Sequence, residues 1–81
     1  MHTGLMWFDN DPKTALAVKI RKASDYYSKK FGRQPDICLV NPSMLGGQAS
    51  ETVEEHGRQI TVRPYRPVLP GHLWIGVEEE N

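Results

Sequence analysis

The chain has 81 residues, enough for one domain with a single modest core. Its ten basic and ten acidic residues cancel at pH 7, which excludes a global field that would attract nucleic acid or an anionic membrane. Cys38 is the only cysteine, so the chain has no internal disulfide and suits a reducing cytoplasm. No segment approaches the roughly 20 apolar residues of a membrane span, so we expect a soluble cytoplasmic protein with no membrane partner.

The first predicted elements are a strand over residues 5–8 and a long helix over residues 12–31. Asp11 can cap free backbone N–H groups at the helix start. Pro12 suits the first helical turn because that position leaves the backbone donor unpaired in any case. Gly32 predicts an end in the left-handed conformation. Apolar side chains spaced four, three, four and four residues apart form one face of this helix: Leu16, Ile20, Ala23, Tyr27 and Phe31.

Three further strands are predicted, over residues 36–40, 59–63 and 73–77. The order of strand, helix and strand at the start of the chain favours a right-handed parallel crossover. The strand over residues 59–63 alternates apolar and polar side chains, with Ile60 and Val62 inward, as an edge strand does.

Residues 43–57 contain a Gly-Gly pair and few apolar side chains, which predicts a mobile loop. The sequence allows two alternative local structures within this loop. One is a short helix over residues 51–56, which we prefer. The other is a hairpin that turns at His56-Gly57 and pairs Thr52-Val53 with Ile60-Thr61.

Prolines 64, 67 and 70 recur at every third residue, the period of a polyproline II helix. Such a segment can dock into an aromatic groove of a partner protein. We prefer a stiff connector between two strands, because both of its ends are anchored. Since proline cannot donate to a ladder, the connector is expected outside the sheet.

These elements predict an α+β fold: a small mixed β-sheet in the order β-α-β-loop-β-β, with one long helix packed on one face. The chain is one domain over residues 1–81, with a frayed leader at residues 1–4 and an acidic tail at residues 78–81. Three of the strands are apolar on both sides, yet one helix covers only one side. We therefore expect a homodimer that buries the uncovered face, and the predicted dimer face carries Trp7, Val40 and Trp74.

No catalytic, cofactor or metal motif stands out. Asp9, Asn10 and Asp11 offer oxygen atoms to a hard cation, but they lack the central glycine and distal glutamate of a calcium loop. The three histidines have no zinc spacing with Cys38, whose apolar neighbours predict a buried, inert thiol. We expect no cofactor, no metal and no enzyme activity, and predict a bacterial-type accessory or protein-interaction module.

Nucleic-acid binding is the alternative function. Residues 13–33 hold seven basic residues and one acidic residue. A basic row with an aromatic side chain can follow a phosphate backbone and stack a base. Lysines on an exposed helix face usually only solvate it, which makes this the second choice. The candidate nucleic-acid face comprises Lys22, Tyr26, Lys29, Arg63 and Arg66.

A strand that ends in Asn-Pro at residues 35–42 is followed by a loop, a Gly-x-x-aliphatic-x-Val strand at residues 57–62 and a Pro-Gly turn into a last strand at residues 70–76. This arrangement resembles a stretch of the major capsid proteins of tailed phages. It covers about half of the chain. The resemblance implies a phage-like or mobile-element origin and the same strand order. The family's long helix and extended arms have no counterpart here, so it does not imply a capsid subunit.

Overall fold

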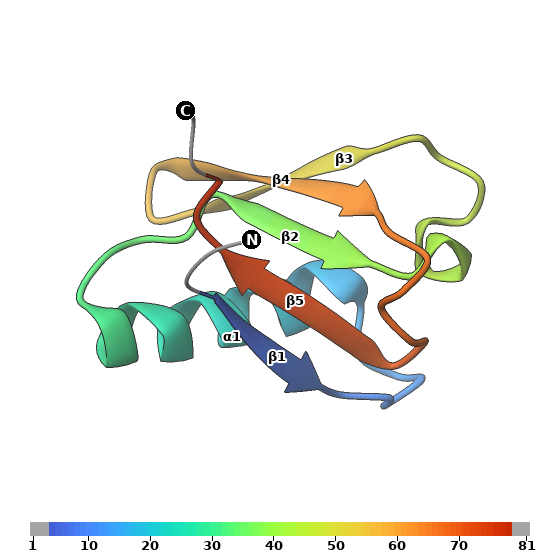
Figure 1. The fold of residues 1–81 in the computed structure, drawn as a ribbon, viewed down its shortest axis with the longest axis horizontal. Helices are drawn as coiled ribbons and strands as arrows, with labels where there is room; N and C mark the ends of the chain where they lie inside the picture. The colour runs from blue at the N-terminus through green and yellow to red at the C-terminus, as the bar shows by residue number, and fades with distance from the viewer. Residues whose placement is uncertain (1–3, 79–81) are drawn as a thin grey trace.

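One helix packs against one face of a five-stranded mixed sheet in the computed structural model, which describes residues 4–78 (Figure 1). The elements in chain order are β1 (Gly4–Phe8), α1 (Leu16–Phe31), β2 (Ile37–Val40), the 3-10 helix η1 (Pro42–Leu45), β3 (Glu51–Glu55), β4 (Arg58–Pro64) and β5 (His72–Gly76). The predicted α+β class is confirmed. The greater part of the predicted leader and of the acidic tail, residues 1–3 and 79–81, lies outside the described residues.

The strand order in the sheet is β1-β5-β2-β4-β3. β5 is antiparallel to both of its neighbours, β1 and β2, whereas β2 and β4 are parallel. β1 and β2, which α1 connects, therefore run in the same direction, as predicted, but they do not pair with each other. β5, the last of the five described strands, lies between them (Figure 1).

β3 and β4 form an antiparallel hairpin, which corrects the preferred prediction of a short helix over residues 51–56 and adds a fifth strand. Val53 pairs with Ile60, as in the alternative that the sequence left open. His56 and Gly57 make the turn with φ of 52° and 77°. Positive φ at both central residues is the requirement of a type I′ hairpin turn, whose twist matches that of the strands. Pairing with β4 thus outweighs the local helix signals.

The hairpin also changes the position of β4. Because β3 takes the edge, β4 is an inner strand and not the predicted edge strand. Its apolar side chains Ile60 and Val62 are buried, as predicted. Of the predicted loop over residues 43–57, only residues 46–50 and the hairpin turn at residues 56–57 have neither helix nor strand structure, and Leu45 of η1 is buried in the core.

The core lies between α1 and the sheet. Ile20, Ala23 and Tyr27 are fully buried, and Leu16 and Phe31 pack partly buried at the two ends, which confirms the predicted apolar face of the helix. The sheet supplies the other side of this core through Cys38, Val40, Val53, Ile60, Val62, Leu73 and Ile75. Burial raises the pKa of the Cys38 thiol to about 12, so this thiol stays protonated and inert near neutral pH.

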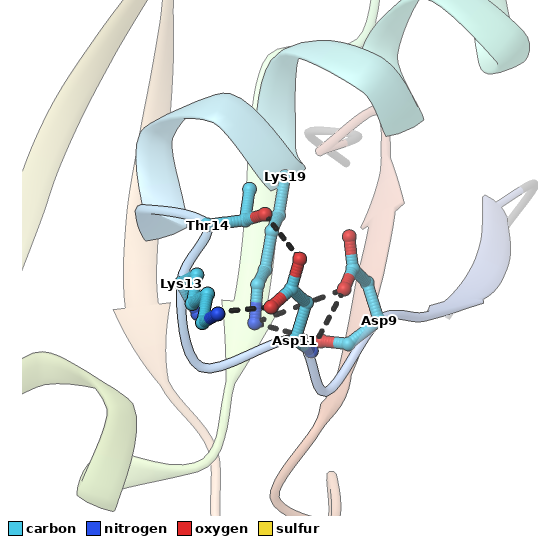
Figure 2. Close-up of polar contacts among 5 residues, drawn as sticks. All are labelled: Asp9, Asp11, Lys13, Thr14 and Lys19. Carbon is cyan, nitrogen blue, oxygen red and sulfur yellow. Dashed lines mark hydrogen bonds and ion pairs between the residues drawn. The ribbon is translucent and has the colours of Figure 1, made fainter.

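Gly32 ends α1 with φ of 73° and donates its N–H to the carbonyl of Ser28, as a left-handed C-cap does. The start of the helix differs from the prediction. α1 begins at Leu16, and Ala15 holds the N-cap position without a side-chain cap. Asp11 instead stabilises a separate turn, in which it accepts the N–H of Lys13 at 2.9 Å and the hydroxyl of Thr14 at 2.8 Å (Figure 2).

A buried lysine ties this turn to α1. Lys19 Nζ donates to the backbone carbonyl of Asp9 at 2.9 Å and lies 4.0 Å from Asp9 Oδ1 (Figure 2). Asp9 Oδ1 also accepts the N–H of Asp11 at 3.0 Å. The carboxylates that the sequence offered as cation ligands therefore have protein partners, and these contacts fix the chain between β1 and the helix.

We expect Asp11→Ala to lower the melting temperature, because it removes both acceptors of the turn. The hydrogen bonds from the Lys13 N–H and the Thr14 hydroxyl lower the pKa of Asp11 below its usual 3.8. A folded-state pKa below the unfolded value gives stability that is complete above pH 3.8 and is lost as the pH falls through the lowered value. Thermal melts between about pH 2 and pH 7 should therefore show a difference that shrinks in acid.

Thr14→Val is the matched control for this prediction, because it removes one hydrogen bond of the turn and keeps the carboxylate. It should lower the melting temperature less than Asp11→Ala. A difference between wild type and Asp11→Ala that is the same at every pH would contradict the role given to the carboxylate.

The proline-rich connector folds as two successive turns and not as an extended polyproline II helix. Val68 N–H donates to the carbonyl of Tyr65 at 3.1 Å, and His72 N–H donates to the carbonyl of Leu69 at 3.0 Å. Val68 is buried, and its carbonyl accepts the side-chain amide of Asn41 at 3.0 Å. Apart from its first proline, which ends β4, the connector lies outside the sheet, as predicted.

Candidate functional site

The three residues of the predicted dimer face do not share one face of the sheet. Trp7 points to the helix side, where its ring centroid lies 5.6 Å from that of Tyr26. Val40 is fully buried in the same core. Only Trp74 lies on the helix-free side, since its neighbours in β5 point into the core. A strand that is apolar on both sides does not indicate which side meets the helix, so this part of the prediction is corrected.

We call the helix-free side of the sheet the open face. Its apolar part consists of Met6 and Phe8 from β1, Ile37 and Leu39 from β2 and Trp74 from β5, and of these Ile37 is buried. Trp74 is in register with Met6 on one side and with Leu39 on the other, so the three form a row across neighbouring strands. Met6 is 54% exposed and Phe8 is 59% exposed. The edge of the sheet at β1 thus presents large apolar side chains to water.

The indole ring of Trp74 lies on the backbone of β1. A Cβ atom at Gly4 would collide with the six-membered ring of this indole. Glycine in a strand often marks such a close approach. The ring therefore spans from β5 to the edge strand and joins the row of apolar side chains into one surface.

Polar groups border this apolar surface. The ring of His72 lies against that of Phe8, with 4.7 Å between the centroids. On β4, Arg63 makes an ion pair with Glu78 through two contacts of 2.9 and 3.4 Å. An apolar centre with a polar rim is the usual anatomy of a protein interface.

The five residues of the candidate nucleic-acid face are divided between different surfaces. Lys22, Tyr26 and Lys29 lie on the exposed side of α1, whereas Arg63 lies on the open face, on the other side of the sheet. Arg66 lines a hollow of about 370 Å³ beside η1. The structure therefore brings three of the five together and leaves no single basic surface.

A cluster that the sequence did not reveal lies between α1 and the β3–β4 turn. It consists of Asp25 on the helix, Glu55 at the end of β3 and His56 in the turn, and one ligand atom from each lies within 4.8 Å of the others. His56 Nε2 is 3.4 Å from Asp25 Oδ1 and 3.6 Å from Glu55 Oε2. Asp25 is far in the chain from the neighbouring residues Glu55 and His56, and it meets them only because the hairpin forms beside α1. No local spacing signals them.

Glu55 is the unusual member of this cluster. Its residue is only 8% exposed, and its Oε2 atom has no hydrogen-bond partner among the described residues. Burial raises the pKa of Glu55, and the Asp25 carboxylate raises it further. A hydrogen bond with the Glu55 carboxyl group lowers the pKa of Asp25. The two carboxyl groups therefore shift each other's pKa in opposite directions.

Comparison with known proteins adds no relative: no family model matches the chain, and searches of curated proteins and of solved structures found no match. The resemblance of residues 35–76 to tailed-phage capsid proteins therefore stays a prediction. Among the residues of the described part of the chain, no helix is long and apolar enough to cross a membrane. A function can be argued from two features, the open face and the cluster of Asp25, Glu55 and His56.

Proposed function

We propose that the protein is a non-catalytic interaction module that binds a second copy of itself through the open face. The observation that carries this proposal is the exposure of Met6 and Phe8 beside the Trp74 ring. Burying apolar surface contributes about 25 cal/mol per Å², so a contiguous patch of this kind favours association. In a two-fold symmetric homodimer each copy contributes the same patch, so apolar side chains of one copy contact apolar side chains of the other.

The size of the open face sets the expected affinity. Five strands at a spacing of about 4.8 Å and about five residues at 3.3 Å cover roughly 400 Å² of sheet. Side-chain relief enlarges the accessible area, but the contact stays near or below the ~800 Å² per partner of a standard interface. We therefore expect a reversible dimer that dissociates on dilution through the micromolar range, and not an obligate one.

Light scattering over a series of protein concentrations tests the proposal. The wild-type mass should rise from one chain to two as the concentration increases. Phe8→Glu places a charge in the apolar patch and should weaken the dimer by about ten-fold or more. Val18→Glu is the matched control, because Val18 is an exposed apolar residue on α1, away from the open face.

Circular dichroism should confirm that both variants are folded, so that a change in mass reports association alone. Dimerisation of the control should equal that of the wild type. A wild-type monomer at every concentration would overturn the proposal, and so would a Phe8→Glu dimer of unchanged affinity.

A further inference from the structure

We propose that Asp25, Glu55 and His56 form a binding site for a divalent first-row metal ion, with Zn²⁺ as its natural probe. Glu55 and the other ligands lie on the helix side of the sheet, away from the open face. The proposal therefore does not depend on the dimer. One imidazole nitrogen and two carboxylate oxygens form a ligand set that zinc commonly accepts, with a fourth position left for water.

The distances within the cluster fit a shared cation better than direct hydrogen bonds. Zinc bonds of about 2.0–2.1 Å in a tetrahedron place the ligand atoms about 3.3–3.4 Å apart. His56 Nε2 lies 3.4 Å from Asp25 Oδ1 and 3.6 Å from Glu55 Oε2. A good N–H···O hydrogen bond has a donor–acceptor distance of about 2.9–3.0 Å. The two separations from His56 are therefore close to those of a coordination shell before any ion binds, and all three ligand atoms lie within 4.8 Å of one another.

The unpaired oxygen of Glu55 is an independent indication. This side chain is more than nine-tenths buried, and its Oε2 atom, the one that faces His56, has no hydrogen-bond partner in the described part of the chain. By contrast, Asp9, Asp11 and Asp36 each accept a backbone N–H. A buried carboxylate oxygen without a donor is costly, and a cation would satisfy it.

The elements that carry the ligands are held in place. Arg21 Nε on α1 donates to the carbonyl of Glu54 on β3 at 3.0 Å, which fixes the strand beside the helix. The left-handed conformation of His56, followed by Gly57, sets the direction of the imidazole. A bound ion would therefore join α1 to the hairpin and stabilise the folded state by an amount that rises with the logarithm of the ion concentration above the dissociation constant.

Zinc titration of the metal-free protein against a chromophoric chelator is the first test. We expect one Zn²⁺ per chain, and Co²⁺ should give the intense visible absorption of a four-coordinate site. Loss of a residue that only hydrogen-bonds to a metal ligand costs about 10–100-fold in metal affinity, so each substitution of a ligand itself should cost at least that much. The substitutions are Asp25→Asn, Glu55→Gln and His56→Asn, and asparagine tolerates the positive φ of residue 56.

Two control variants are matched to these. Glu54→Gln removes the neighbouring carboxylate, which points to the other side of β3, and His72→Asn removes a histidine outside the cluster. Both should bind zinc as the wild type does. Zinc should also raise the melting temperature of the wild type and the controls but not that of the ligand variants. If Glu55→Gln does not fold, Asp25→Asn at the exposed helix surface decides the question.

A preformed site of these ligands should be filled at about 100 μM metal ion. The proposal would be overturned if neither Zn²⁺ nor Co²⁺ binds at that concentration. Binding that survives all three ligand substitutions would overturn it too, since the ion would then be held elsewhere. Because these measurements report metal affinity and not mass, their outcome is separate from that of the light-scattering test.

Discussion

Replacing Ile20 with Ala should lower the free energy of unfolding by about 2–5 kcal/mol. Ile20 is fully buried at the centre of the contact between α1 and the sheet. The substitution removes buried methyl groups and leaves a cavity, because strands that are fixed by their ladder cannot close onto the helix. A domain of 81 residues has a total stability of about 4–12 kcal/mol, so the loss would be a large part of it.

Urea unfolding followed by tryptophan fluorescence measures this loss. Val18→Ala is the control, since Val18 lies on the same helix and is partly exposed. Its effect should stay within about 0.5 kcal/mol. Both variants should be compared at one low protein concentration, because a dimer makes the apparent stability depend on concentration. Equal, small effects at the two positions would show that α1 does not pack as described.

Gly4→Ala should destabilise the fold by about 1–3 kcal/mol, the usual cost of overpacking. Alanine has the higher propensity for strands, so an effect in this direction needs a specific cause. The cause is the indole ring of Trp74, which occupies the space that the new methyl group needs. The ring would have to leave the backbone of β1, and its fluorescence should shift as it becomes more exposed.

A double-mutant cycle isolates this contact. In a Trp74→Leu background the indole ring is absent, so Gly4→Ala should cost little or nothing there. The coupling between the two positions then equals most of the loss seen in the wild-type background. The same cost in both backgrounds would mean that the methyl group meets something other than this ring.

The helix was the most predictable element, because its apolar spacing and its terminal glycine are local signals. Its start was not. A carboxylate followed by proline is typical of a helix N-terminus, but the same side-chain acceptor also stabilises an isolated turn, and at Asp11 it does the latter. Sequence alone does not separate the two, since both use bonds between residues two or three apart.

The hairpin and the two faces of the sheet depend on distant residues. His56-Gly57 is a weaker turn signal than Asn-Gly, and it becomes decisive only when β4 is there to pair. Trp7 and Val40 belong to strands that are apolar on both sides, so their burial under α1 follows from the sheet order and not from their neighbours in sequence. The sequence did not predict the cluster of Asp25, Glu55 and His56 for the same reason, because these residues meet only when that hairpin forms.

The central place of β5 has a consequence for how the chain is made. β1 is at the edge of the sheet, and among the described residues it pairs only with β5, the last of the five strands in chain order. Until residues 72–76 have left the ribosome, β1 has no partner strand in the described sheet, and β2 can pair only with β4. Contacts between such distant segments form slowly. The nascent chain therefore acquires its complete sheet only after β5 has been made, and chains that stop before β5 should be substrates for chaperones and proteases.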